Sequence, residues 1–147
     1  DSSLVLRKFS NIEQHLFASQ AYLNEYGTPK MPEDLIEHRI LSMADEHIDQ
    51  IMILHDDQNQ QKKIKINPIL MGSNLMMLGS LVSQNCGIAL LPDTIAHDYV
   101  VTGKLVRVLP DWKAPHGIFH AVYPSRRGLL PAVRVFIDYL VEHLSLR

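Results

Sequence analysis

The chain has 147 residues, of which 46% are hydrophobic and 20% charged, a composition that excludes a disordered protein and favours one globular domain or two small lobes. The formal net charge of -2 argues against nucleic-acid binding by the whole surface, because such binding draws on an excess of Lys and Arg. A single cysteine excludes an internal disulfide, and no apolar segment reaches the length of a membrane span, so we expect a cytoplasmic protein without membrane contact.

Two short helices are expected in the first third of the chain. Residues 19–27 begin with Ser19, placed to cap a helix N-terminus, and end with Gly27, placed to end the helix in a left-handed conformation. Residues 31–38 place Pro32 at the first helical position and two acids in the first turn, where the helix macrodipole favours them.

The middle of the chain predicts a strand hairpin, then a helix and a buried strand. The expected hairpin strands are residues 51–54 and 62–70, and the second alternates lysine and isoleucine with the period of a strand that has one wet face. Residues 72–87 follow as a helix. The apolar residues 88–91 are too few for a helix and lie between a glycine and a proline, which predicts a strand buried in a parallel sheet.

The last third repeats this pattern before adding a further strand and a long helix. A helix ending near Gly103 precedes an expected strand over residues 105–109. Residues 119–125 are typical of a strand. Residues 129–146 carry apolar side chains at helical spacing behind Pro131, so the chain as a whole is predicted to be of the α/β class.

Five segments together resemble, in their order and approximate spacing, the effector-binding region of a LysR-type transcriptional regulator. The resemblance implies an α/β, two-lobed fold of the periplasmic-binding-protein-like (type 2) class, with an inducer site in the cleft between the lobes. The segments are "DSSLVLRKF" (1–9), "ASQAYLNEYGTPKMPEDLIEHRIL" (18–41), "GIALLP" (87–92), "GKLVRVLPDW" (103–112) and "YPSRRGLLPAVRVFIDYLVEHL" (123–144).

The resemblance also divides the chain. Residues 18–117 would form a complete effector-binding lobe II, whereas residues 1–17 and 118–147 would be the remnant of lobe I. The family's DNA-binding winged helix-turn-helix is absent from this chain, so we expect DNA contact only through that missing N-terminal domain. Because the remnant of lobe I would expose apolar surface, we expect the chain to self-associate as a dimer or a higher oligomer.

One residue departs from the family pattern close to the buried strand. Members commonly have a glycine two residues before Gly87, and this chain has Asn85 there. Asparagine adopts a left-handed backbone more easily than most residues, so the fold is expected to tolerate it. The substitution would place a polar side chain near the end of the preceding helix.

Six residues are candidate ligand contacts, since the resemblance places them at the cleft: Ser19, Gln20, Met71, Gly72, Ser73 and Asn74. The backbone N–H groups after Gly72, with the Ser73 hydroxyl, are expected to hold a carboxylate or another anion, as helix N-termini commonly do. The alternative is that Ser73, Asn74 and Ser19 only cap helices. Likewise Met71, with Met76, either lines a soft pocket or fills the core.

No metal, cofactor or catalytic role is expected. His116 and His120 are four residues apart, but on a strand this spacing separates them by roughly 13 Å. The sequence also lacks a Gly-x-Ser-x-Gly elbow and a phosphate-cradling Gly-x-x-x-x-Gly-Lys. We therefore expect a binding protein and not an enzyme.

Two functions remain in competition. In the first, a small metabolite binds the cleft of a sensing domain, changes the relative pose of two lobes and so controls a DNA-bound regulator. In the alternative, the chain is a solute-binding protein of a transporter with the same fold. The residues do not identify the metabolite under either hypothesis.

Overall fold

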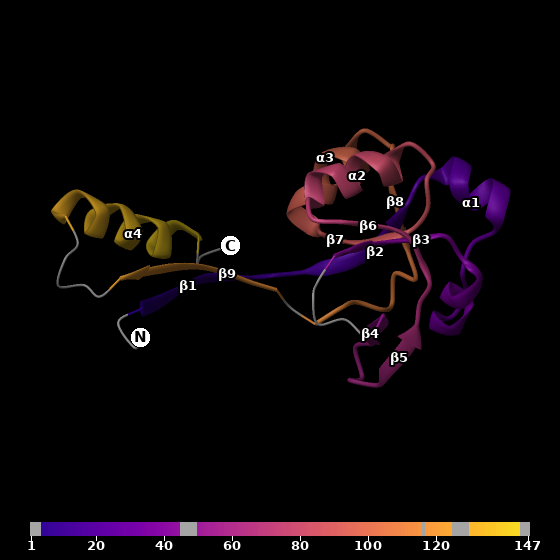
Figure 1. The fold of residues 1–147 in the computed structure, drawn as a ribbon, viewed down its shortest axis with the longest axis horizontal. Helices are drawn as coiled ribbons and strands as arrows, with labels where there is room; N and C mark the ends of the chain where they lie inside the picture. The colour runs from indigo at the N-terminus through magenta and orange to yellow at the C-terminus, as the bar shows by residue number, and fades with distance from the viewer. Residues whose placement is uncertain (1–3, 45–49, 116, 125–129, 145–147) are drawn as a thin grey trace. The chain divides into compact units, whose positions relative to one another are not determined.

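The computed structural model describes residues 4–44, 50–115, 117–124 and 130–144 (Figure 1). The chain forms two compact units, Glu13–Pro115 and a smaller unit made of Asp1–Ile12 with His116–Arg147. Among the described residues, no helix has both the length and the apolar character that crossing a membrane requires.

The smaller unit consists of two strands and one helix. Strand β1 (Leu4–Ile12) pairs antiparallel with β9 (Gly117–Pro124), with a register shift between Lys8 and Ser10. Helix α4 (Pro131–Leu144) begins at the expected proline and contacts β1. The strand and the helix expected at the end of the chain are therefore confirmed for the described residues.

In the residues that the structure describes, the larger unit is built on a three-stranded and a two-stranded sheet, which an isolated bridge joins side by side. Strand β2 pairs antiparallel with β7 and β8, and β3 pairs parallel with β6. A parallel bridge between Ile40 and Ile88, with the Leu41 N–H donating to the Ile88 carbonyl at 2.9 Å, joins β3 to β7. The strand order is thus β6-β3-β7-β2-β8, made of β2 (Gln14–Ala18), β3 (Ile40–Met43), β6 (Pro68–Gly72), β7 (Ala89–Pro92) and β8 (Val106–Val108).

Each face of this sheet is covered by different elements, because side chains alternate along the strands. Phe17 and Ala89 pack in one core cluster with residues of α2 (Leu75–Ser83) and α3 (Asp93–Val101), the two helices that Figure 1 shows on one side of the strands. Leu16 and Ile88 face the opposite side. That side is covered by α1 (Gln20–Tyr26), the 3₁₀ helix η1 (Pro32–Glu37) and the hairpin of β4 (Ile51–His55) and β5 (Gln61–Lys65).

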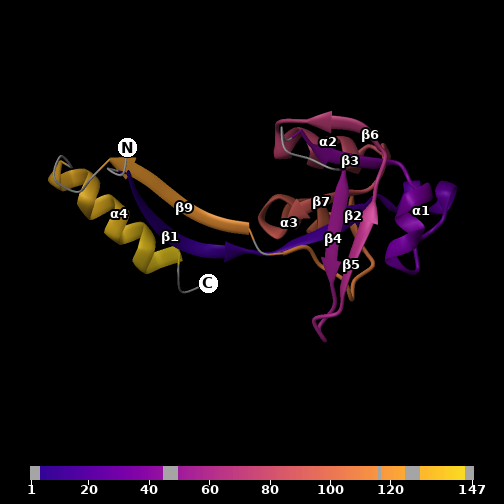
Figure 2. The same cartoon turned by 60° about the horizontal axis from the view of Figure 1, so that its bottom comes forward.

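Two sequence expectations need correction. Residues 31–38 hold a 3₁₀ helix and not an α-helix, although Pro32 and the two acids occupy the expected first turn. The expected strand 62–70 is two strands, since β5 pairs antiparallel with β4 whereas β6 pairs parallel with β3 (Figure 2). Ile66 and Asn67 separate them, and β6 begins at Pro68, a residue that cannot donate to a continuing ladder.

Gly87 has a different role from the one that its position suggests. The left-handed residue after α2 is Asn85, with φ of 69°, as its tolerance of that conformation predicts. At Gly87 the chain passes so close to β3 that a Cβ atom would collide with the carbonyl oxygen of Arg39. A glycine is therefore needed to pair the buried strand β7 with β3.

Candidate ligand site

The connections of β3 and β7 leave the sheet in opposite directions. From β3 the chain passes through the β4–β5 hairpin to β6 on one side, whereas from β7 it passes through α3 to β8 on the other side. In open α/β sheets, ligands bind at the carboxyl ends of strands where the connections diverge in this way. The carboxyl ends of β3 and β7 are therefore the candidate ligand edge.

A pocket of about 90 Å³, which we call the sheet pocket, lies on the face that the hairpin covers and reaches from Pro68 at the start of β6 to Ser42 and Met71 near the carboxyl ends of β3 and β6. Ser42 of β3 and Met71 of β6 are register partners, and Leu90 of β7 completes the strand side. The hairpin covers it from the other side. The lining residues are Ser42, Gln50, Ile51, Met52, Ile66, Pro68, Met71 and Leu90.

The start of α2 follows β6 at the same edge. The N-cap is Asn74 and not Ser73, because the Asn74 Oδ1 atom accepts from the backbone N–H groups of Met76 at 2.9 Å and Met77 at 3.3 Å. Gly72 is buried, and Ser73 is exposed, with no side-chain hydrogen bond to a described residue. The structure thus brings Met71, Gly72, Ser73 and Asn74 together at one edge, as consecutive residues with different roles.

Ser19 and Gln20 lie at the opposite edge. Strand β2 runs antiparallel to its neighbours, so Gln14 is beside Pro92 at the end of β7, and Phe17 is beside Ala89 at its start. At about 3.3 Å per residue, Ser19 is more than a strand length from the carboxyl edge. The structure therefore does not bring the two groups of candidate residues together, and ligand contact by each of them stays a prediction.

The Ser19 side chain forms its hydrogen bonds within the fold. Its side chain is 3% exposed, accepts from the backbone N–H of Tyr22 at 3.1 Å and donates to the Asn85 Oδ1 atom at 2.5 Å. It therefore caps α1 and also fastens that helix to the turn before β7. Gln20 is exposed and donates to Asn24 at 3.0 Å.

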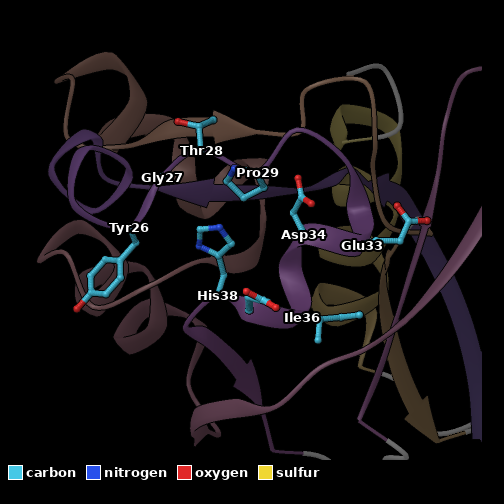
Figure 3. Close-up of a pocket in the computed structure, with 9 residues that line it drawn as sticks. Tyr26, Gly27, Thr28, Pro29, Glu33, Asp34, Ile36 and His38 are labelled. Carbon is cyan, nitrogen blue, oxygen red and sulfur yellow. The ribbon is translucent and has the colours of Figure 1, made fainter.

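A larger pocket, of about 470 Å³, lies beside α1 and η1 at the Ser19 edge, and Figure 3 shows His38 between Tyr26 and Asp34 in this view. Two of its carboxylates, Glu33 and Asp34, already have partners within the fold. Glu33 accepts from Lys62 at 2.7 Å, which lowers the pKa of Glu33. Asp34 accepts from the backbone N–H groups of Lys30 and Met31, which lower its pKa.

His38 belongs to a hydrogen-bonded group that sequence reasoning did not find. The buried Tyr22 hydroxyl accepts from the Arg39 backbone N–H at 3.1 Å and shares a second hydrogen bond with Nδ1 of His38 at 2.8 Å. Burial lowers the pKa of His38 and raises that of Tyr22. This group ties α1 to the start of β3, and no spacing in the sequence marks it.

In the part of the chain that the structure describes, no three His, Cys, Asp or Glu side chains gather closely enough to hold a metal ion. His116 of the histidine pair considered above lies outside the described residues. The carboxyl edge itself offers hydroxyl, amide and thioether groups, which suit the binding of a small molecule.

Comparison with known proteins identifies the family. The family model described as "LysR substrate binding domain" matches residues 1–145. The chain belongs to the LysR substrate-binding domain family. The expected two-lobed, periplasmic-binding-protein-like α/β fold is confirmed, since solved LysR regulatory domains share it. This LysR family consists of transcriptional regulators, which are not enzymes.

Three relatives illustrate the match. An HTH-type transcriptional regulator of Xanthomonas campestris is 32% identical over 148 residues, covering 99% of this chain and 43% of that protein. The CrgA regulatory domain of Neisseria meningitidis, a LysR-type regulator, is 32% identical with a TM-score of 0.84, covering 99% of this chain and 71% of that chain. The regulatory domain of an AphB variant from Vibrio vulnificus is 32% identical with a TM-score of 0.81, covering 97% of this chain and 72% of that chain.

The LysR-family chain described here spans about half the length of the curated relatives it matches. The similarity nevertheless extends over nearly all of its own residues, including both compact units. These matches favour the regulator over the solute-binding protein of a transporter.

Proposed function

We propose that this chain is the ligand-sensing domain of a LysR-type transcriptional regulator and binds a small metabolite at the carboxyl ends of β3 and β7. The observation that carries the proposal is the sheet pocket at the point where the two strand connections diverge. Met71 to Asn74 form one border of this edge, since β6 ends there and α2 begins. We therefore place the ligand beside these residues and leave Ser19 and Gln20 to the opposite edge.

Ligand binding would act on DNA indirectly. A ligand shifts a conformational equilibrium only by as much as it binds one conformation better than the other. We propose that this difference in affinity changes how a DNA-binding N-terminal domain of the regulator sits on its operator in the cytoplasm. The net charge of -2 supports a division of labour in which this domain senses and another contacts DNA.

The proposal is tested with two tryptophan substitutions in the full-length regulator. Ser73 and Gln20 are both exposed polar residues that lie at opposite edges of the sheet. We expect Ser73→Trp to obstruct the carboxyl edge, so that native mass spectrometry of regulator purified from its own cells detects much less of a retained small molecule. The matched control Gln20→Trp should retain it at the wild-type level.

The opposite pattern would overturn this placement. If Gln20→Trp loses the retained molecule and Ser73→Trp keeps it, the ligand occupies the Ser19 edge. If both variants and the wild type carry no small molecule and the regulator responds to none, ligand sensing itself is wrong. Circular dichroism on both variants checks that their folds are equal.

We also propose that the chain self-associates, and helix α4 supports this. Several of its large apolar side chains are exposed, with Phe136 at 59% and Val135 at 67%. Exposed apolar surface of this kind favours association between chains. Sedimentation equilibrium should show a dimer or a higher oligomer that Phe136→Ser weakens, and a wild-type chain that stays monomeric at all concentrations would contradict the proposal.

A further inference from the structure

The sheet pocket is built from uncharged groups, which bears on the class of ligand. None of its lining residues is charged, and six of the eight are Ile, Leu, Met or Pro. A cavity of about 150 Å³ with apolar walls is large enough to hold benzene. At about 90 Å³, the sheet pocket fits a branched alkyl group of about four carbons.

Two neutral polar side chains border the apolar walls. The Ser42 hydroxyl has only a long contact of 3.5 Å with the Met43 carbonyl, and the Gln50 side chain has no hydrogen bond to a described residue. A hydroxyl and a carboxamide each donate and accept. They suit a ligand that carries a hydroxyl, carbonyl or amide next to its apolar end.

Among the residues that the structure describes, few groups at this edge can compensate an anion. Asn74 already occupies the N–H groups of Met76 and Met77 that would otherwise be directed at an anion. A carboxylate entering the sheet pocket would lose its hydration without meeting a cation, which is costly. In the described part of this edge, these contacts favour an uncharged group over the anion expected at the start of α2.

We propose that the effector is an uncharged small molecule whose compact, branched apolar end enters the sheet pocket beside Ser42, Met71 and Leu90. This inference rests on the proposed ligand-sensing function and names the chemical class of its ligand. It also gives Met71 a specific role. Met71 is 41% exposed and forms a wall of the sheet pocket.

Two probes of similar shape and different charge test the ligand class. Isobutanol and isobutyrate are titrated separately into the full chain, and binding is followed by saturation-transfer NMR. We expect isobutanol to bind at millimolar concentration and isobutyrate to bind at least tenfold more weakly. Equal binding of the two, or stronger binding of isobutyrate, would overturn the proposal, as would the absence of isobutanol binding.

A pair of phenylalanine substitutions tests the location. Met71→Phe should fill the sheet pocket and weaken isobutanol binding at least tenfold, whereas Met76→Phe, on a side chain that is 70% exposed and outside the lining, should leave it unchanged. If Met71→Phe does not fold, Ser42→Leu fills the same space. Unchanged binding in the pocket-filling variant would show that the probe binds elsewhere and overturn the proposal.

The probe experiments test the chemical class of the ligand, whereas Ser73→Trp tests the place where the ligand binds. If Ser73→Trp removes the retained molecule in the full-length regulator and the probes show no preference for the neutral ligand, the domain senses a ligand of another class. If Ser73→Trp also has no effect, the placement of the ligand at this edge is wrong.

Discussion

Helices α1 and α2 begin in the same way but in different surroundings. Both are capped by a small polar side chain, Ser19 in α1 and Asn74 in α2. Ser19 is buried and bonded to Asn85 in a distant turn, whereas Asn74 is exposed and bonds only within its own helix among the described contacts. A capping residue thus shows where a helix begins, but burial determines whether it serves the fold alone or borders a surface open to ligand.

The largest expected effect comes from the turn that Ser19 holds. Gly87→Ala should lower the free energy of unfolding by about 3 kcal/mol or more, because the new Cβ collides with the Arg39 carbonyl and the Leu41 side chain. Urea unfolding measures this. The control Gly103→Ala introduces the same group at a positive φ with open space around it, and should cost only about 1 kcal/mol.

A collision of backbone atoms cannot be relieved by rotating a side chain. If Gly87→Ala and Gly103→Ala destabilise the chain equally, the close approach of the turn to β3 is not what requires glycine at position 87.

Substitutions at the two helix starts measure how much each cap contributes to the free energy of unfolding. Ser19→Ala should cost about 2 kcal/mol, since it removes a cap and leaves Asn85 without its donor, and Asn74→Ala should cost about 1 kcal/mol. Ser73→Ala should change stability by less than about 0.5 kcal/mol. Thermal and urea unfolding of the three variants give the ranking, and a Ser73→Ala loss as large as that of Asn74→Ala would contradict the assignment of Asn74 as the cap.

The smallest effect is a pH dependence confined to the α1 side of the sheet. Burial lowers the pKa of His38, so the unfolded chain binds a proton there more readily than the folded chain does. Its stabilising contribution is present above the ordinary value of 6.5 and is lost as pH falls through the lower folded value. His38→Gln should therefore flatten the curve of unfolding free energy against pH below 6.5.

Urea unfolding over a series of pH values measures this slope in the wild type and in His38→Gln. An equal slope in the wild type and in His38→Gln would show that His38 is not the group whose protonation opposes folding.

The sequence predicted most helices because their caps and periodicity are local. It did not predict β2 or β3, since four or five residues carry little periodicity and their pairing partners lie far away along the chain. The split of residues 62–70 depends on β6 finding β3, which is likewise a tertiary event. Local signals therefore predicted helices well and the assembly of the sheet poorly.

The candidate site divides in the same way. The residue types of Ser73 and Asn74 predicted that a helix begins there. They did not predict which of these two neighbours is the N-cap, and the structure assigns Asn74. The resemblance placed Ser19 at the same cleft as these residues. The antiparallel direction of β2 places Ser19 at the opposite edge, and no residue within the strand encodes its direction.

The central position of β2 has a consequence for how the chain folds. Its two neighbours are β7 and β8, which begin at Ala89 and Val106, so the apolar strand at residues 14–18 leaves the ribosome long before either partner exists. Pairing over such separations requires costly loop closure and is slow. During synthesis this strand is exposed to misassembly and to capture by chaperones until β7 and β8 have emerged.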